Sequence, residues 1–145
     1  FGPYQNPDGV YASVIPKFIN LLMSHNQPTI YGDGKQSRDF TFVQNVVKAN
    51  CLAANAPLQN KHEHINIGCN ESIDLTSLTK YIIETMSKFD AEIGNLQPIY
   101  AEPRVGDIKD SLASIEKAKA ILGYEPEILV KKGIEITTQW FYNKQ

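Results

Sequence analysis

Two arginines carry the clearest chemical signal in the sequence. Arg38 follows a glycine-rich turn, Arg104 precedes a Val-Gly-Asp segment, and neither falls within a predicted helix. A guanidinium group presents a planar fork of N–H donors, which matches the oxygens of a phosphate or carboxylate. The two arginines therefore indicate anion binding, with an ordinary surface ion pair as the alternative for each of them.

Tyr31 adds a second signal near Arg38. It ends a predicted strand directly before Gly32-Asp33-Gly34, so its ring can offer a face to a stacked base. The alternative is that Tyr31 only covers the core at the end of the strand. The glycines do not form a P-loop, because the third glycine, the Lys-Ser/Thr pair and the following helix are missing. An aromatic ring and an arginine together indicate a nucleotide.

The histidines and cysteines indicate neither a metal site nor a nucleophile. His25, His62 and His64 occupy positions expected to face solvent, and no two of them have the spacing of metal ligands. Cys51 stands among Ala and Leu in a predicted amphipathic helix, where we expect it to be a small buried hydrophobic side chain. Cys69 follows a predicted strand, and nothing near it in the sequence would lower the pKa of its thiol.

Length and composition limit the classes of protein that these residues can serve. The chain has 145 residues, which is enough for one domain with a core of ordinary size. Hydrophobic residues make up 42% and charged residues 21%, which excludes a disordered or fibrous protein. The net charge of -2 argues against a broad nucleic-acid surface, and no apolar run approaches the roughly 18 residues of a membrane span.

Two further features concern the protein's setting. The two cysteines lack a CxxC motif or a partner of metal-ligand spacing, which favours a reducing, cytoplasmic compartment. The chain opens on Phe1 without an initiator methionine, so we expect it to be part of a longer protein.

Turn formers and periodic apolar residues predict alternating helices and short strands. Gly, Pro, Asn and Asp crowd residues 1–10, which predicts a loop. Apolar residues at helical spacing predict about five helices, over residues 14–24, 42–54, 75–89, 115–122 and 130–142. Short strands are predicted over residues 29–31, 38–42, 64–67 and 98–101, the first two forming a hairpin-like unit. This order favours an α/β fold.

Capping residues mark the ends of the predicted helices. The Thr-x-x-Gln sequence that begins at Thr41 is a capping box, and Asp74 and Ser114 can cap the helices that follow them. Gly123 stands where a left-handed residue commonly ends a helix. The last helix has no Ser or Asp cap at Leu129, so we expect its first turn to fray.

Several motifs in a fixed order resemble one enzyme family over almost the whole chain. They are FGPYQNPDGVYASVIPKFI, IYGDGKQSRDFTFVQNVVKA, INIG and RVGDIKDSLASIEKAKAILGYEP. This order resembles the C-terminal half of the extended short-chain dehydrogenase/reductases, in particular the bacterial UDP-N-acetylglucosamine 4-epimerases of surface-polysaccharide synthesis. UDP-glucose 4-epimerases, UDP-glucuronate epimerases and dTDP-glucose 4,6-dehydratases share much of the pattern.

The resemblance implies an α/β fold that comprises the substrate-binding portion of a Rossmann-type enzyme, with residues 1–145 as one C-terminal domain. The family's Gly-x-x-Gly-x-x-Gly loop does not occur in this sequence, and the only Tyr-x-x-x-Lys spacing, from Tyr31 to Lys35, spans the glycine-rich turn and not a predicted helix. We therefore expect the NAD-binding half to be absent and this chain alone to carry no catalytic residue, no cofactor and no activity. The full-length enzyme is expected to use NAD, to bind a UDP-sugar and to form a homodimer.

The resemblance also assigns roles to residues that contact the nucleotide. Val14 and Lys17 match the helix that meets the uridine diphosphate, and Tyr31 matches the position that packs near uracil. Arg38 and Arg104 match the two arginines that clasp the diphosphate. Phe18 and Thr29 depart from the residues common in close relatives, which affects the contacts with the base rather than the arginine clasp.

Three other positions have roles nearer the sugars. Asp107 matches the carboxylate that accepts hydrogen bonds from the ribose hydroxyls, which a short acceptor suits. Through the resemblance, Gln5 matches a position in the loop that faces the hexose. Ser111 matches the position that sets the size of the sugar pocket, where a small residue accompanies acceptance of N-acetylated sugars.

The resemblance implies C4 epimerisation of UDP-N-acetylglucosamine or UDP-glucose through a 4-keto intermediate. Two alternatives remain open. The first is a nucleotide-sugar dehydratase or decarboxylase, which differs from an epimerase in the catalytic segment that this sequence lacks. The second is a non-catalytic module that binds UDP-sugars with the same pocket.

Overall fold

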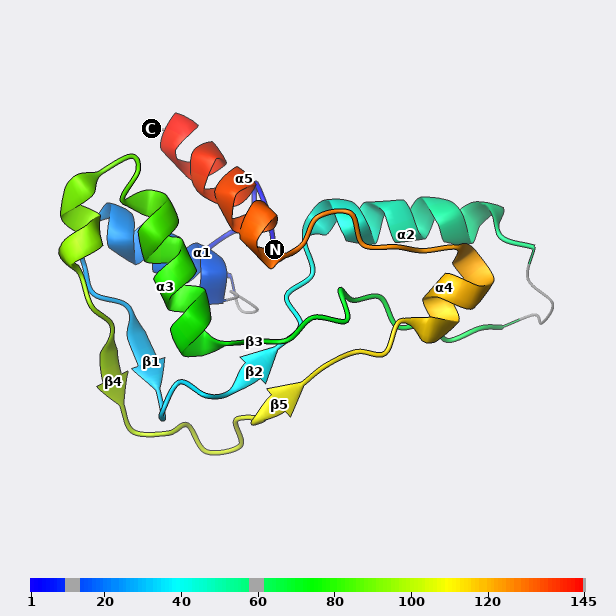
Figure 1. Cartoon of the computed structure of the whole chain (residues 1–145), viewed down its shortest axis with the longest axis horizontal. Helices are drawn as coiled ribbons and strands as arrows, with labels where there is room; N and C mark the ends of the chain where they lie inside the picture. The colour runs from blue at the N-terminus through cyan, green and yellow to red at the C-terminus, as the bar shows by residue number, and fades with distance from the viewer. Residues whose placement is uncertain (10–13, 58–61, 145) are drawn as a thin grey trace.

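The computed structural model describes residues 1–9, 14–57 and 62–144. Helices and short strands alternate along the chain (Figure 1), which confirms the α/β class. The predicted loop over residues 1–10 is confirmed for residues 1–9, and Val10 lies outside the described residues. The elements are α1 (Val14–Met23), β1 (Thr29–Tyr31), β2 (Ser37–Arg38), α2 (Val43–Asn55), β3 (Ile73–Asp74), α3 (Leu75–Met86), the 3-10 helix η1 (Ala91–Asn95), β4 (Ile99–Ala101), β5 (Asp110–Ser111), α4 (Glu116–Leu122) and α5 (Val130–Asn143).

The elements gather around two hydrophobic cores at the two ends of an elongated molecule (Figure 1). The larger core lies where α1, α3 and α5 pack together, and it includes Ile30 of β1 and Ile93 of η1. The smaller core joins α2 and α4 through Ala49, Ala118 and the fully buried ring of Tyr124. The short strands β2, β3 and β5 lie between the two ends.

Helices α1 and α3 form because their apolar residues recur every three or four positions on one face. The buried stripe of α1 is Ile15, Phe18, Ile19 and Leu22, and that of α3 includes Leu78, Ile82 and Met86. Pro16 is tolerated because it lies in the first turn of α1, where its missing N–H costs no hydrogen bond. Asp74 caps α3 as predicted, since its carboxylate accepts a hydrogen bond from the Ser77 backbone N–H at 2.8 Å.

The predicted hairpin of the first two strands is wrong. Strand β1 pairs in parallel with β4, whereas β2 pairs antiparallel with β3 and parallel with β5. Gly32 and Gly34, with φ of 82° and 74°, turn the intervening chain away from β1. The carbonyl oxygens of Gly34 and Gln36 accept hydrogen bonds from the first residues of α3, which leads β2 into a separate sheet.

Two predicted strands are shorter or missing. The strand predicted over residues 38–42 is confined to Ser37–Arg38, because only there does the chain have ladder partners on both sides. Residues 64–67 are not a strand, although His64 and Asn66 are exposed while Ile65 and Ile67 are half-buried, as alternation predicts. A strand needs a neighbour to form a ladder, and residues 64–67 have none among the described residues.

The helix ends confirm some of the predicted caps and correct others. Gly123 ends α4 in the left-handed region with φ 62°, and Leu129 precedes α5 without a side-chain cap, both as predicted. The predicted caps Thr41 and Ser114 are wrong, because α2 and α4 each begin one residue later than expected and no side chain caps either helix.

Helix α2 buries Asn45 and Ala49 rather than its valines. Asn45 is 1% exposed and Ala49 3%, whereas Val47 is 56% exposed. Cys51, predicted to be buried, is exposed because it lies outside the Asn45–Ala49 stripe that faces the small core. The Asn45 amide binds the segment before α5: its Oδ1 accepts from the N–H groups of Glu127 and Ile128, and its Nδ2 donates to the Ile128 carbonyl at 2.7 Å.

Tyr124 provides a prediction for alkaline solution. Its buried phenol donates a hydrogen bond to the Gly68 carbonyl at 2.9 Å, and burial raises its pKa to about 12, with added effects of Cys69 and Asp39. Because the pKa is raised in the folded protein, the stabilising contribution is complete below the unfolded pKa of about 10 and is lost as the pH rises toward 12. We expect the difference in unfolding free energy between the unmodified chain and Tyr124→Phe to shrink over this interval. Urea titrations of both chains test this, and a constant difference would contradict it.

Candidate functional site

A cavity of about 340 Å³ brings together segments that are far apart in the sequence. It lies between α1, the end of β1, the start of α3 and the loop after β4. A second hollow of about 420 Å³ adjoins it, since the two share several lining residues. The first cavity is lined by Val14, Lys17, Phe18, Leu21, Thr29, Tyr31, Gln36, Leu75, Arg104 and Asp107, and the second by Val14, Gln36, Arg38, Asp39, Phe40, Leu75 and Asp107.

Five of the eight sequence-predicted site residues line the first cavity: Val14, Lys17, Tyr31, Arg104 and Asp107. Val14 and Lys17 come from α1, where a spacing of three places them on one helix face. Tyr31 is the last residue of β1, and Arg104 and Asp107 belong to the loop that follows β4. The parallel pairing of Tyr31 with Ala101 explains why this loop starts beside Tyr31.

Arg38 lines the second hollow from β2 and is held by three acceptors. Its Nη2 donates to the Asp107 carboxylate at 2.8 Å, and its Nη1 donates to the carbonyls of Ser37 at 2.8 Å and Lys109 at 3.3 Å. The side chain is 26% exposed, so the guanidinium is fixed in place and still reaches solvent. Arg38 therefore forms an ion pair, and its partner is another predicted site residue.

Arg104 lies over the ring that the sequence marks for stacking. Its guanidinium carbon is 3.9 Å from the centre of the Tyr31 ring, which is a cation–π distance. Arg104 itself is exposed, whereas Tyr31 is half-buried against the wall of the cavity. A guanidinium group that lies on an aromatic face does not use its N–H donors for that contact. These donors can therefore still bind an anion.

Gln5 and Ser111 line neither of these two cavities. Gln5 lies in the loop over residues 1–9, and its buried Oε1 has no hydrogen-bond partner among the described residues. Ser111 is exposed in β5, where it stands opposite Arg38 in the parallel ladder. Ser111 is thus next to the arginine in the sheet, but its hydroxyl does not form part of either cavity wall.

Gln36 is a wall residue that the sequence reasoning missed. It lines both cavities, and its Nε2 donates to the Tyr31 carbonyl at 2.6 Å, which links the end of β1 to the start of β2. The spacing from Arg38 could have identified it. Residues two apart in an extended segment lie on the same face, and Gln36 stands two positions before Arg38.

Asp39 anchors the loop over residues 68–70 behind the second hollow. Its carboxylate accepts hydrogen bonds from the backbone N–H of Cys69 at 2.9 and 3.0 Å and of Asn70 at 3.1 Å. Gly68 permits this approach, since a Cβ there would lie 2.5 Å from Asp39 Oδ2. Burial raises the pKa of the Cys69 thiol and the Asp39 charge raises it further, so Cys69 is not an activated nucleophile.

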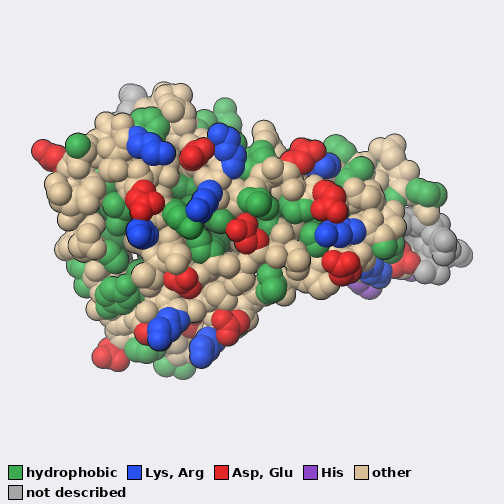
Figure 2. Space-filling view, in the orientation of Figure 1, with side chains coloured by type: hydrophobic (Ala, Val, Ile, Leu, Met, Phe, Trp, Pro, Cys, Tyr) green, Lys and Arg blue, Asp and Glu red, His purple; other side chains and the backbone are tan. Residues whose placement is uncertain are grey.

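The described residues offer neither a cluster of metal ligands nor a membrane-spanning helix. No three His, Cys, Asp or Glu side chains among the described residues could together hold a metal ion. Within residues 1–9, 14–57 and 62–144, no helix is both long and apolar enough to cross a membrane. Figure 2 shows cationic and anionic side chains interspersed over the visible face rather than gathered in one patch.

Comparison with known proteins relates the chain to one group of enzymes. The model of the NAD dependent epimerase/dehydratase family matches residues 1–68. A putative UDP-glucose 4-epimerase of Methanocaldococcus jannaschii is 37% identical over 99% of this chain and 43% of its own length. The human dTDP-D-glucose 4,6-dehydratase is 31% identical over 97% of this chain and 39% of its own length. The chain thus spans less than half the length of these relatives.

Solved structures agree with the sequence matches. The UDP-N-acetylglucosamine 4-epimerase of Methanobrevibacter ruminantium, in complex with UDP-N-acetylmuramic acid, matches with a TM-score of 0.87 at 34% identity, over all of this chain and 44% of the other. The UDP-glucose 4-epimerase of Thermotoga maritima with UDP-glucose gives 0.85 at 30% identity, over 99% and 43%. The UDP-glucuronic acid 4-epimerase of Bacillus cereus, bound to its sugar nucleotide and NAD, gives 0.83 at 26% identity, over 100% and 43%.

Proposed function

We propose that this chain, which is homologous over nearly its whole length to enzymes of the NAD dependent epimerase/dehydratase family, is the part of a nucleotide-sugar epimerase that binds the nucleotide. The predicted resemblance to the C-terminal part of extended short-chain dehydrogenase/reductases is thereby confirmed. The observation that carries the proposal is the meeting of Tyr31, Arg104 and Asp107 around one cavity, with Arg38 ion-paired to Asp107.

Each of these side chains suits one part of a uridine diphosphate sugar. The forks of Arg38 and Arg104 suit the diphosphate oxygens, and the Tyr31 ring suits the flat base. The Asp107 carboxylate is an acceptor for vicinal ribose hydroxyls. Lys17 on α1 adds a mobile positive charge at the cavity wall. We propose that the sugar beyond the diphosphate passes toward Gln5, and that Ser111 limits the space for a substituent on that sugar.

The glycine turns in the described part of the chain do not fit the pyrophosphate of NAD. In dinucleotide-binding folds a glycine-rich turn leads from a strand into a helix N-terminus that faces the pyrophosphate. Here the glycine turn after β1 leads into β2 instead. We therefore assign the cofactor of the proposed enzyme to parts of the protein other than residues 1–145. This chain contributes by fixing the non-reacting diphosphate, and such binding energy orients the sugar carbon that reacts.

Within this proposal, epimerisation at C4 of UDP-glucose or UDP-N-acetylglucosamine is the reaction that the matched epimerases favour. A dehydratase or decarboxylase is the second candidate, supported by the 31% identity to the human dehydratase. We further propose a cytoplasmic homodimer that serves surface-polysaccharide synthesis. A non-catalytic UDP-sugar-binding module would use the same cavity.

Calorimetric titration of the 145-residue chain tests the proposed binding. We expect UDP and UDP-N-acetylglucosamine to bind saturably at one site and NAD not to bind. Uridine serves as the matched control, because it keeps the base and ribose but lacks the diphosphate that the arginines hold. Saturable binding of NAD, or equal affinity for uridine and UDP, would contradict the proposal.

A further inference from the structure

We propose that Asp107 competes internally for the anion site of Arg38, so that the loop over residues 102–109 is a latch that a nucleoside diphosphate opens by exchange of partners. This inference rests on the proposed function, because it concerns the same cavity. The latch would let the chain discriminate between ligands. A ligand gains its contacts only by replacing the contact of Arg38 with Asp107 or that of Arg104 with Tyr31.

The backbone fixes the two ends of this latch loop. Ala101, just before it, pairs with Tyr31 in the β1–β4 ladder. At the other end the Ser37 N–H donates to the Lys109 carbonyl at 2.8 Å. The residues between are exposed, and a turn closed by the Asp107 N–H and the Arg104 carbonyl at 3.3 Å passes through Gly106, whose φ is 82°.

Two side-chain contacts hold the middle of the latch loop over the cavity. Asp107 Oδ1 lies 2.8 Å from Arg38 Nη2, and the Arg104 guanidinium lies 3.9 Å from the centre of the Tyr31 ring. Each contact joins the loop to the opposite wall, because Arg38 and Tyr31 belong to β2 and β1. The loop is therefore closed by the same four side chains to which we assign the nucleotide.

The Arg38 contacts make the competition direct. Its two Nη atoms already donate to the Ser37 carbonyl, the Lys109 carbonyl and the Asp107 carboxylate. Carboxylate and phosphate oxygens occupy the same positions on a guanidinium fork, so a two-point phosphate contact at the Nη atoms must displace Asp107. The side chains of Arg38 and Asp107 are 26% and 38% exposed, and an ion pair that reaches solvent exchanges at low cost.

Arg104 covers the face of the Tyr31 ring that we assign to the base. A guanidinium group on an aromatic face covers the surface that a flat ring would use. A ligand with both a phosphate and a ring replaces both contacts, and the freed Asp107 then accepts ribose hydroxyls. Inorganic pyrophosphate has no flat ring, so it can displace Asp107 from Arg38 without taking the place of Arg104 on the Tyr31 ring. Comparison of the two ligands therefore isolates the Arg38–Asp107 exchange from the other contacts.

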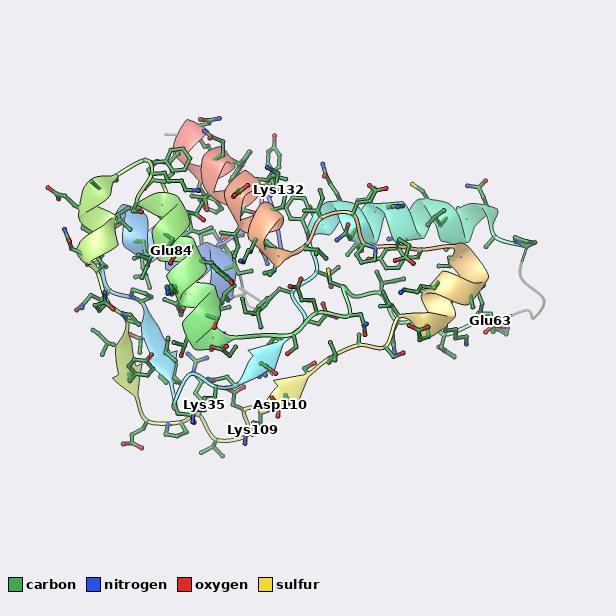
Figure 3. The ribbon with its side chains drawn as sticks, in the orientation of Figure 1. Lys35, Glu63, Glu84, Lys109, Asp110 and Lys132 are labelled. Atoms are coloured by element: carbon green, nitrogen blue, oxygen red, sulfur yellow. The ribbon has the colours of Figure 1, made fainter. Side chains whose placement is uncertain are left out.

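The test uses Asp107→Asn in the full 145-residue chain, with calorimetric titration of pyrophosphate and of UDP. We expect the variant to bind pyrophosphate about three to ten times more tightly, because Arg38 no longer holds a carboxylate. The gain for UDP should be smaller, since the variant also lacks the charged acceptor for ribose. Asp110→Asn is the matched control: Figure 3 shows Asp110 beside Lys109 at the end of the loop, and it bonds Ser37 Oγ rather than Arg38. We expect it to change pyrophosphate affinity less than twofold.

A double-mutant cycle separates partner exchange from general charge repulsion. In an Arg38→Ala chain, Asp107→Asn should no longer improve pyrophosphate binding beyond the Asp110→Asn effect. An equal gain with and without Arg38, or no gain over Asp110→Asn, would overturn the latch. UDP binding by the unmodified chain reports on the proposed function separately. A chain that binds UDP but shows no Asp107 effect keeps the function and loses the latch.

Discussion

We expect a chain that carries Arg38→Ala to bind UDP about 10 to 150 times more weakly than the unmodified chain, a loss of about 1.5 to 3 kcal/mol. The reason is that a hydrogen bond between ionised groups is stronger than a neutral one, and that Arg38 is already positioned by two backbone carbonyls. Arg104→Ala should lose affinity in the same range. Calorimetric titration with UDP measures both losses.

Lysine substitutions at the same positions separate charge from geometry. Arg38→Lys and Arg104→Lys should recover only part of the lost affinity, because an ammonium group is a point charge without a planar fork. Lys35→Ala is the matched control, since Lys35 is an exposed cation in the turn between β1 and β2 and lines neither cavity. Unchanged UDP affinity in both alanine variants would identify Arg38 and Arg104 as ordinary surface charges.

Residue type and family resemblance located most of the candidate site, but not its internal contacts. Tyr31, Arg104 and Asp107 stand out as a ring, a cation and an acceptor, and they line one cavity. The pairing of Arg38 with Asp107 joins residues 69 apart in the sequence. No local pattern encodes such a pair, because it depends on β2 lying next to β5. The same holds for the Arg104 contact with Tyr31, which follows from the pairing of β1 with β4.

Helices were predictable from sequence and strand pairings were not, for a physical reason. A helix closes its hydrogen bonds within one segment, so the periodicity of α1 and α3 was sufficient. A strand depends on a neighbour, and alternation at residues 64–67 correctly described burial but could not supply one. The two glycines after β1 looked like a hairpin turn, although their direction was decided by hydrogen bonds to the start of α3.

Helix α2 shows how tertiary hydrogen bonds override apolar periodicity. Its valines would be expected to face a core, yet Val43 and Val47 are 42% and 56% exposed. Asn45 takes the buried position because its amide matches three backbone groups of the segment before α5. That segment leads from the small core, which holds Tyr124, into the large core, which holds Val130. We infer that Asn45 is a principal link between the two cores.

We therefore expect Asn45→Ala to lower the free energy of unfolding by about 2 to 4 kcal/mol, because buried polar groups without partners are costly. The substitution leaves the N–H groups of Glu127 and Ile128 and the Ile128 carbonyl without the amide that satisfies them. Asn45→Asp should lose at least as much, since it buries a charge and places a carboxylate oxygen against the Ile128 carbonyl oxygen, which lies 2.7 Å from Asn45 Nδ2. Urea unfolding followed by circular dichroism measures these changes.

Asn50→Ala is the control for the loss at Asn45, because it removes the same side chain from the same helix. Asn50 is exposed and its Nδ2 donates only to the Val46 carbonyl at 2.9 Å, within its own helix. Surface substitutions of this kind change stability by about 0.5 kcal/mol or less. Equal effects of Asn45→Ala and Asn50→Ala would mean that the buried amide does not link the cores. A larger loss confined to Asn45 would show that its hydrogen bonds to the segment before α5 stabilise the packing of α2.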